Sequence, residues 1–205
     1  MIGYYNYTVI LTYLSLISAM FGTHLAFNQE YVGALICLLF CGAFDSFDGI
    51  VARTKKDRTD EEKKFGIQID SLVDVIAFGI FPAIIGYSMG LTEWYWGFVF
   101  CLFACGAVSR LAYFNVAEET RQNQTAEKRK YYQGLPVTSA SLIFPAVYLL
   151  KCIIGFTNMT LVYGVMMAVV AVAFVVNFKV VKPGLRGVMI MVVVGLFVCI
   201  GMLLV

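Results

Sequence analysis

Charged residues are scarce in this chain, making up 14% of its 205 residues, whereas hydrophobic residues make up 60%. A water-soluble domain of this length would have too few polar side chains to cover its surface. The chain has one histidine, and its six cysteines form no Cys-x2-Cys pair, which argues against a zinc site. The net charge is only +2. It gives no support to nucleic-acid binding and fits contact with anionic lipid headgroups.

Long apolar segments take up most of the chain. Each is close to the roughly 20 residues that a membrane-spanning helix needs. The seven segments are Asn6–Phe27, Tyr31–Arg53, Gly66–Gly90, Glu93–Ala117, Leu135–Ile154, Met159–Phe178 and Gly187–Val205. We therefore predict an all-α polytopic membrane protein that forms a single domain over residues 1–205.

The basic residues gather in alternate connections between these segments. The predicted loops at about 54–65, 118–134 and 179–186, together with Arg53, hold thirteen of the fifteen Lys and Arg residues. Because cytoplasmic loops collect positive charge, we expect the N-terminus in the cytoplasm and, after seven crossings, the C-terminus outside.

Four aspartates interrupt the second and third apolar segments: Asp45, Asp48, Asp70 and Asp74. Each costs about 2.5–3.5 kcal/mol at the centre of a bilayer and less near the interface. Asp45 and Asp48 are three residues apart and Asp70 and Asp74 four apart, so each pair shares one face of its helix. We expect the two pairs to meet just below the cytoplasmic surface.

Clustered carboxylates repel one another, and one or two divalent cations would compensate that repulsion. Oxygen ligands suit hard ions such as Mg²⁺ or Mn²⁺. The small residues Gly49, Ala52 and Gly66 beside the aspartates allow close approach of backbone and ligand. Two alternatives remain at this point: aspartates paired with Lys or Arg for folding, and a cation path through a transporter.

The aspartate region resembles the signature of the CDP-alcohol phosphotransferases. That signature is Asp-x2-Asp-Gly-x2-Ala-Arg, a spacer, and Gly-x3-Asp-x3-Asp. Its fixed positions correspond to Asp45, Asp48, Gly49, Ala52, Arg53, Gly66, Asp70 and Asp74, in the motif region 45–74. The spacer TKKDRTDEEKKF is longer than the family usually has, which affects a polar surface loop and not the motif.

The resemblance implies a six-helix core, here with a seventh helix, a homodimer, and an active site that faces the cytoplasm. It implies that two Mg²⁺ or Mn²⁺ ions bind Asp45, Asp48 and Asp70, with Asp74 bordering them as the general base. CDP-diacylglycerol would be the donor substrate, and membrane lipids would surround the protein. The residues lining its pocket would be Asp48, Gly49, Ala52, Arg53 and Gly66.

The acceptor alcohol is predicted from two other stretches. The run SRLAYFNV contains Arg110 and Asn115, and YYQGLPVTSAS contains a Gly134–Pro136 junction. Both resemble stretches of the phosphatidylserine synthases in this family, although Tyr113 replaces an arginine of their pattern. We expect Arg110 and Asn115 to bind serine, so that the product is phosphatidylserine. Glycerol 3-phosphate is the alternative acceptor, and Arg110 has the alternative role of pairing with an aspartate.

Two functions of other classes make different predictions. A cation transporter would place carboxylates near the midplane of the membrane and along several helices. A non-catalytic scaffold would tolerate substitution of Asp74. The confinement of the aspartates to the cytoplasmic ends of two neighbouring helices favours the lipid synthase.

Overall fold

The structure is a computed structural model that describes residues 3–124, 131–154, 158–181 and 184–204. Two of the predicted loops therefore fall partly outside the described residues, at 125–130 and 182–183. The basic residues of those two stretches are Lys128, Arg129, Lys130 and Lys182.

Helices account for most of the described chain. The longer ones are α1 (Ile10–Phe27), α2 (Tyr31–Ala52), α3 (Asp60–Asp74), α4 (Phe81–Ser88), α5 (Trp94–Gln124), α6 (Ala140–Ile154), α7 (Met159–Val175) and α8 (Leu185–Leu204). A π-helical stretch, η2 (Val75–Ile80), joins α3 to α4, and short 3-10 turns η1 (Tyr7–Val9) and η3 (Val137–Ser139) precede α1 and α6.

By length and composition, five helical runs of the described chain could cross a membrane, and the regions of α6 and α7 are shorter apolar helices. These seven coincide with the seven predicted segments. The prediction of an all-α polytopic membrane protein is confirmed.

Two helix boundaries differ from the predicted loops. Helix α3 begins at Asp60, so the loop predicted for 54–65 is wrong after residue 59. The hydroxyl of Thr59 accepts from the N–H of Glu62 at 3.1 Å, and the Glu62 carboxylate accepts from the N–H of Thr59 at 2.9 Å. This reciprocal capping box, with acidic residues in the first turn, stabilises a helix start among charged residues. Helix α5 likewise runs on past Ala117 to Gln124.

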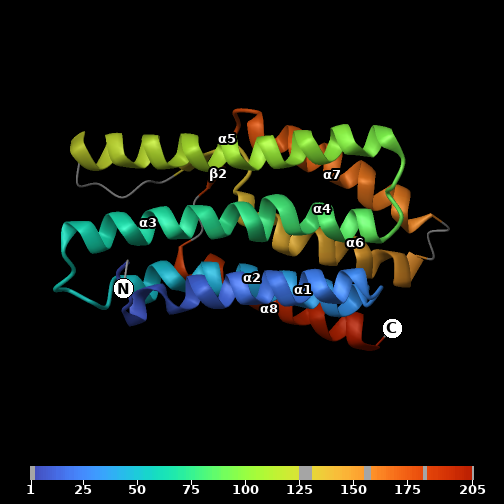
Figure 1. Ribbon diagram of the computed structural model, residues 1–205, viewed down its shortest axis with the longest axis horizontal. Helices are drawn as coiled ribbons and strands as arrows, with labels where there is room; N and C mark the ends of the chain where they lie inside the picture. The colour runs from blue at the N-terminus through green and yellow to red at the C-terminus, as the bar shows by residue number, and fades with distance from the viewer. Residues whose placement is uncertain (1–2, 125–130, 155–157, 182–183, 205) are drawn as a thin grey trace.

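The helices form an elongated bundle in which α1 packs along α2 and α5 along α7 (Figure 1). Helix α6 contacts both α2 and α7, and α8 packs against α2 and α6. A Cβ atom on Gly42 of α2 would lie 2.0 Å from Ser141 Oγ on α6, so this contact requires glycine. The two chain ends lie at opposite ends of the bundle (Figure 1).

A short antiparallel pairing holds the segment before α6. Strand β1 (Tyr131–Gln133) pairs with β2 (Lys179–Val181), with Tyr131 opposite Val181. Gly134 follows with a φ of +78°, a conformation that glycine adopts without strain, and its N–H donates to the carbonyl of Phe178 at 2.7 Å. The sequence analysis did not predict this pairing, which joins the predicted Gly134–Pro136 junction to the chain that follows α7.

Candidate active site

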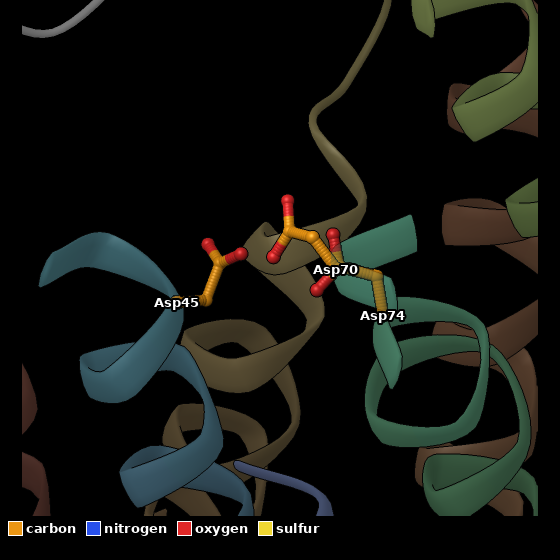
Figure 2. A group of neighbouring side chains, drawn as sticks. All are labelled: Asp45, Asp70 and Asp74. Atoms are coloured by element: carbon orange, nitrogen blue, oxygen red, sulfur yellow. The ribbon is translucent and has the colours of Figure 1, made fainter. Parts of the chain in front are cut away.

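Three aspartates meet where α2 and α3 face each other. One carboxylate oxygen from each of Asp45, Asp70 and Asp74 lies within 4.8 Å of the others. Figure 2 shows Asp45 extending from α2 toward Asp70 and Asp74 of α3. Asp74 is buried, with 7% of its surface exposed, and the other two are half-buried. The predicted meeting of the two helical faces is present.

Asp48 also lies beside Asp70, although it is not one of the three aspartates whose oxygens all converge within 4.8 Å. Its Oδ2 atom accepts a hydrogen bond from Thr12 Oγ1 of α1 at 3.4 Å. Thr12 is buried, with 4% of its surface exposed, so α1 supplies a polar neighbour to the aspartates. The sequence analysis missed Thr12, because a single threonine in an apolar helix gives only a weak signal.

The carboxylate group fits a divalent metal ion. The Oδ1 atom of Asp70 is buried and has no hydrogen-bond partner among the described residues. A buried acceptor without a partner is costly, and a cation or its water ligands would satisfy it. Three convergent carboxylates are also the hard oxygen ligands that Mg²⁺ and Mn²⁺ prefer.

The chain widens into a π-helix directly after Asp74. This stretch, η2, begins at Val75 and carries the buried side chains of Ala77 and Phe78. π-Helical turns are uncommon and occur frequently at functional sites, because the wider turn changes the direction of neighbouring side chains. The end of α3 is thus held in a set geometry by the buried turn that follows it.

The small residues of the signature have two different surroundings. A Cβ atom on Gly49 would meet no described atom within 4 Å, so glycine leaves open space beside Asp48. A Cβ atom on Gly66 would lie 2.7 Å from Arg58 Nη2. Arg53, at the C-cap of α2, is exposed, and the carbonyl of Ala52 accepts from Arg58 Nη1 at 3.3 Å.

The two residues predicted to bind the acceptor face different neighbours. Asn115 Nδ2 donates to Ser71 Oγ at 2.7 Å, which joins α5 to the helix that carries Asp70 and Asp74. Arg110 donates through Nε to the Leu135 carbonyl at 3.1 Å and through Nη2 to the Gly134 carbonyl at 3.4 Å. Five residues along a helix correspond to a rotation of about 140°, so Arg110 and Asn115 lie on different faces of α5.

Arg110 also borders a pocket of about 400 Å³ between α5, β1 and the end of α7. Polar side chains from Ser109, Tyr113, Gln133 and Asn177 line it together with apolar residues of α7. Arg110 is buried, with 7% of its surface exposed. The hydrogen bonds given above go to backbone carbonyls.

Comparison with known proteins identifies relatives of this chain. The CDP-diacylglycerol–serine O-phosphatidyltransferase of Helicobacter pylori is 31% identical over 144 residues, which cover 68% of this chain and 55% of that protein. The archaetidylserine synthase of Methanothermobacter thermautotrophicus is 34% identical over 142 residues, 68% of this chain and 56% of the relative. The CDP-diacylglycerol–serine O-phosphatidyltransferase of Mycobacterium tuberculosis is 28% identical over 146 residues, which cover 71% of this chain and 49% of that protein. The chain spans about half the length of these curated relatives.

A family model covers a larger part of the chain. The model described as CDP-alcohol phosphatidyltransferase matches residues 5–178, a range that includes the signature, all four aspartates and both acceptor candidates. The match ends before α8, as expected for a shared core with an additional helix. This chain belongs to the CDP-alcohol phosphatidyltransferase family.

Proposed function

We propose that this protein transfers the phosphatidyl group of CDP-diacylglycerol to the hydroxyl of serine, forming phosphatidylserine and CMP. The observation that carries the proposal is the convergence of Asp45, Asp70 and Asp74 within 4.8 Å beside the open space at Gly49. The relatives named CDP-diacylglycerol–serine O-phosphatidyltransferase or archaetidylserine synthase support serine over glycerol 3-phosphate as the acceptor.

The carboxylates would hold the metal and accept the proton. Asp45, Asp70 and Asp74, with Asp48 beside them, would bind Mg²⁺ or Mn²⁺, and we propose two ions. A bound ion supplies charge withdrawal from the diphosphate oxygens, which stabilises CMP as the leaving group. Asp74 is the most buried of the four. We assign it as the general base that takes the proton of the serine hydroxyl.

The chemical step needs no co-substrate besides CDP-diacylglycerol and serine. The serine oxygen forms a bond to the lipid-side phosphorus, and the bond from that phosphorus to the CMP oxygen breaks. CMP leaves with the electron pair, and the serine proton goes to Asp74. The residues around Gly49, Ala52, Arg53 and Gly66 would bind the CDP moiety while the acyl chains stay in the bilayer. Holding the reactants in line supplies much of the rate enhancement.

Asn115 is our candidate for contact with serine, and its bond to Ser71, on the helix that carries Asp70 and Asp74, supports this role. Arg110 has a second role in the proposal. Its two hydrogen bonds hold Gly134 and Leu135 in place at the junction before α6. We therefore propose that Arg110 acts on the acceptor site by positioning this junction.

The protein's setting in the membrane is part of the same proposal. We place the active site and the N-terminus on the cytoplasmic side of the cell membrane, on the strength of the basic residues in alternate connections. We also propose a homodimer and a single catalytic domain, on the strength of the family.

A turnover assay tests the proposal. Purified protein in detergent or liposomes receives CDP-diacylglycerol, Mn²⁺ or Mg²⁺, and labelled serine, with Asp74→Asn in parallel. We expect phosphatidylserine and CMP, and a loss of about 100-fold or more in Asp74→Asn. If product forms only with glycerol 3-phosphate, the acceptor is glycerol 3-phosphate and not serine. Turnover that does not depend on metal would contradict the mechanism.

A further inference from the structure

The connection between α2 and α3 places Arg58 across two positions of the signature. Arg58 Nη1 donates to the Ala52 carbonyl at 3.3 Å, and Nη2 donates to the Glu62 carbonyl at 3.3 Å. The same Nη2 atom lies 2.7 Å from the position that a Cβ atom on Gly66 would occupy. The guanidinium thus spans the end of α2 and the first turns of α3.

The spacing along both helices relates Arg58 to the aspartates. Ala52 comes four residues after Asp48, and Gly66 comes four residues before Asp70. Four residues are about one helical turn, a rise of about 6 Å on the same face. Arg58 therefore lies about one turn beyond the carboxylates, toward the end of the bundle at which α2 ends and α3 begins.

The bonding of Arg58 is incomplete. Its Nε atom is buried and has no hydrogen-bond partner in the described chain. No ion pair joins Arg58 to another described residue, and its two bonds go to neutral carbonyls. A buried guanidinium N–H without an acceptor is costly and fits an anionic ligand.

The nearest acidic side chain of α3 is engaged elsewhere. The Glu62 carboxylate accepts from Lys55 Nζ at 2.9 Å, from Asn6 Nδ2 at 3.0 Å and from the N–H of Thr59. These bonds also hold the connection against η1 and raise the pKa of Lys55 through its hydrogen bond to Glu62. The connection that carries Arg58 is thus held in place by these hydrogen bonds. Less conformational entropy is therefore lost when Arg58 binds a ligand.

We propose that Arg58 binds the diphosphate of the CDP-linked donor. The proposal rests on the function proposed above, and it assigns a donor-binding role to a residue outside the signature, in the longer spacer. A guanidinium fork suits phosphate oxygens, because it donates several hydrogen bonds in one plane. Its place about one turn beyond the carboxylates would let one diphosphate contact Arg58 while lying beside the aspartates that would hold the metal.

The experiment compares Arg58→Gln, Arg58→Lys and Lys56→Gln with the wild-type protein, all as full-length chains in detergent. Lys56 is exposed in the same connection, so its substitution is matched for loss of charge. We measure the dissociation constant of CDP, the KM for CDP-diacylglycerol, the KM for serine, and the unfolding temperature. The CDP measurement needs no turnover.

We expect Arg58→Gln to raise the CDP dissociation constant and the donor KM by about 10- to 100-fold, with the serine KM within about 2-fold. Arg58→Lys keeps the charge but loses the fork, so it should fall between wild type and Arg58→Gln. Lys56→Gln should leave both constants within about 2-fold.

Two results would overturn the proposal. CDP affinity unchanged in Arg58→Gln, with only a lower unfolding temperature, would mean that Arg58 only braces the loop. Equal losses in Arg58→Gln and Lys56→Gln would indicate a general charge effect. If the wild-type protein binds CDP but turns over no acceptor, the proposed function is contradicted. The comparison of CDP dissociation constants between wild type and Arg58→Gln would still test the role of Arg58.

Discussion

Asn115 Nδ2 donates a 2.7 Å hydrogen bond to the hydroxyl of Ser71, the residue that follows Asp70. Ser71 Oγ in turn donates to the Ile67 carbonyl at 3.1 Å, so this hydroxyl both accepts and donates a hydrogen bond. The bond from Asn115 joins α5 to the helix that carries Asp70 and Asp74.

Asn115→Ala should lower kcat/KM for serine by about 10-fold, because the amide is lost from the acceptor side of the site. Ser71→Ala should have a smaller effect, since it removes only the group that orients Asn115. Steady-state kinetics of both variants and of the double variant measure this, and the effects should be less than additive. Full additivity of the two substitutions would argue against the coupling.

Thr12→Val should raise the metal concentration needed for half-maximal activity by about 10-fold or more. The hydrogen bond from Thr12 Oγ1 orients Asp48, and groups that orient metal ligands commonly affect affinity by this amount. Thr23→Val is the matched control, because Thr23 donates to the Ala19 carbonyl within its own helix. A Mn²⁺ titration that is identical for the two variants would contradict this role of Thr12.

Mn²⁺ should raise the unfolding temperature of the wild-type protein, because it binds the folded carboxylate group. At a concentration 100 times its dissociation constant, the gain is about 2.7 kcal/mol. Asp70→Asn removes a ligand and should lose most of this response, whereas Asp57→Asn, in the exposed connection, should retain it. Thermal unfolding with and without Mn²⁺ decides the matter without relying on activity. An undiminished response in Asp70→Asn would remove Asp70 from the metal site.

Gly49→Ala should separate stability from activity. The added Cβ meets no described atom, and alanine favours a helix over glycine by about 1 kcal/mol, so the variant should be at least as stable. We expect the KM for CDP-diacylglycerol to rise about 10-fold, because the methyl group enters the space assigned to the donor. Gly97→Ala in α5 also meets no described atom and serves as control. An unchanged KM in Gly49→Ala would place the donor elsewhere.

Local sequence patterns determined most of the architecture. Seven apolar runs predicted the seven helical segments. Inside a bilayer no water is available, so the backbone N–H and C=O groups of an apolar run must form their hydrogen bonds within a helix. The spacings of Asp45, Asp48, Asp70 and Asp74 predicted shared faces, since helical periodicity depends only on neighbours along the chain. The Thr59-x-x-Glu62 pattern also marks the start of α3. The high charge of this stretch nevertheless led to the prediction of a loop.

Tertiary structure decided which groups meet across the bundle. It joined Asp45, Asp70 and Asp74, set Asp48 beside both Asp70 and Thr12, and turned Arg110 and Asn115 toward different partners. It also laid Arg58 against Ala52 and Gly66. Such contacts depend on the rotation and depth of each helix against its neighbours, which many side chains set together through close packing. The sequence by itself determines which face of a helix carries a group, and the packed bundle determines what that face meets.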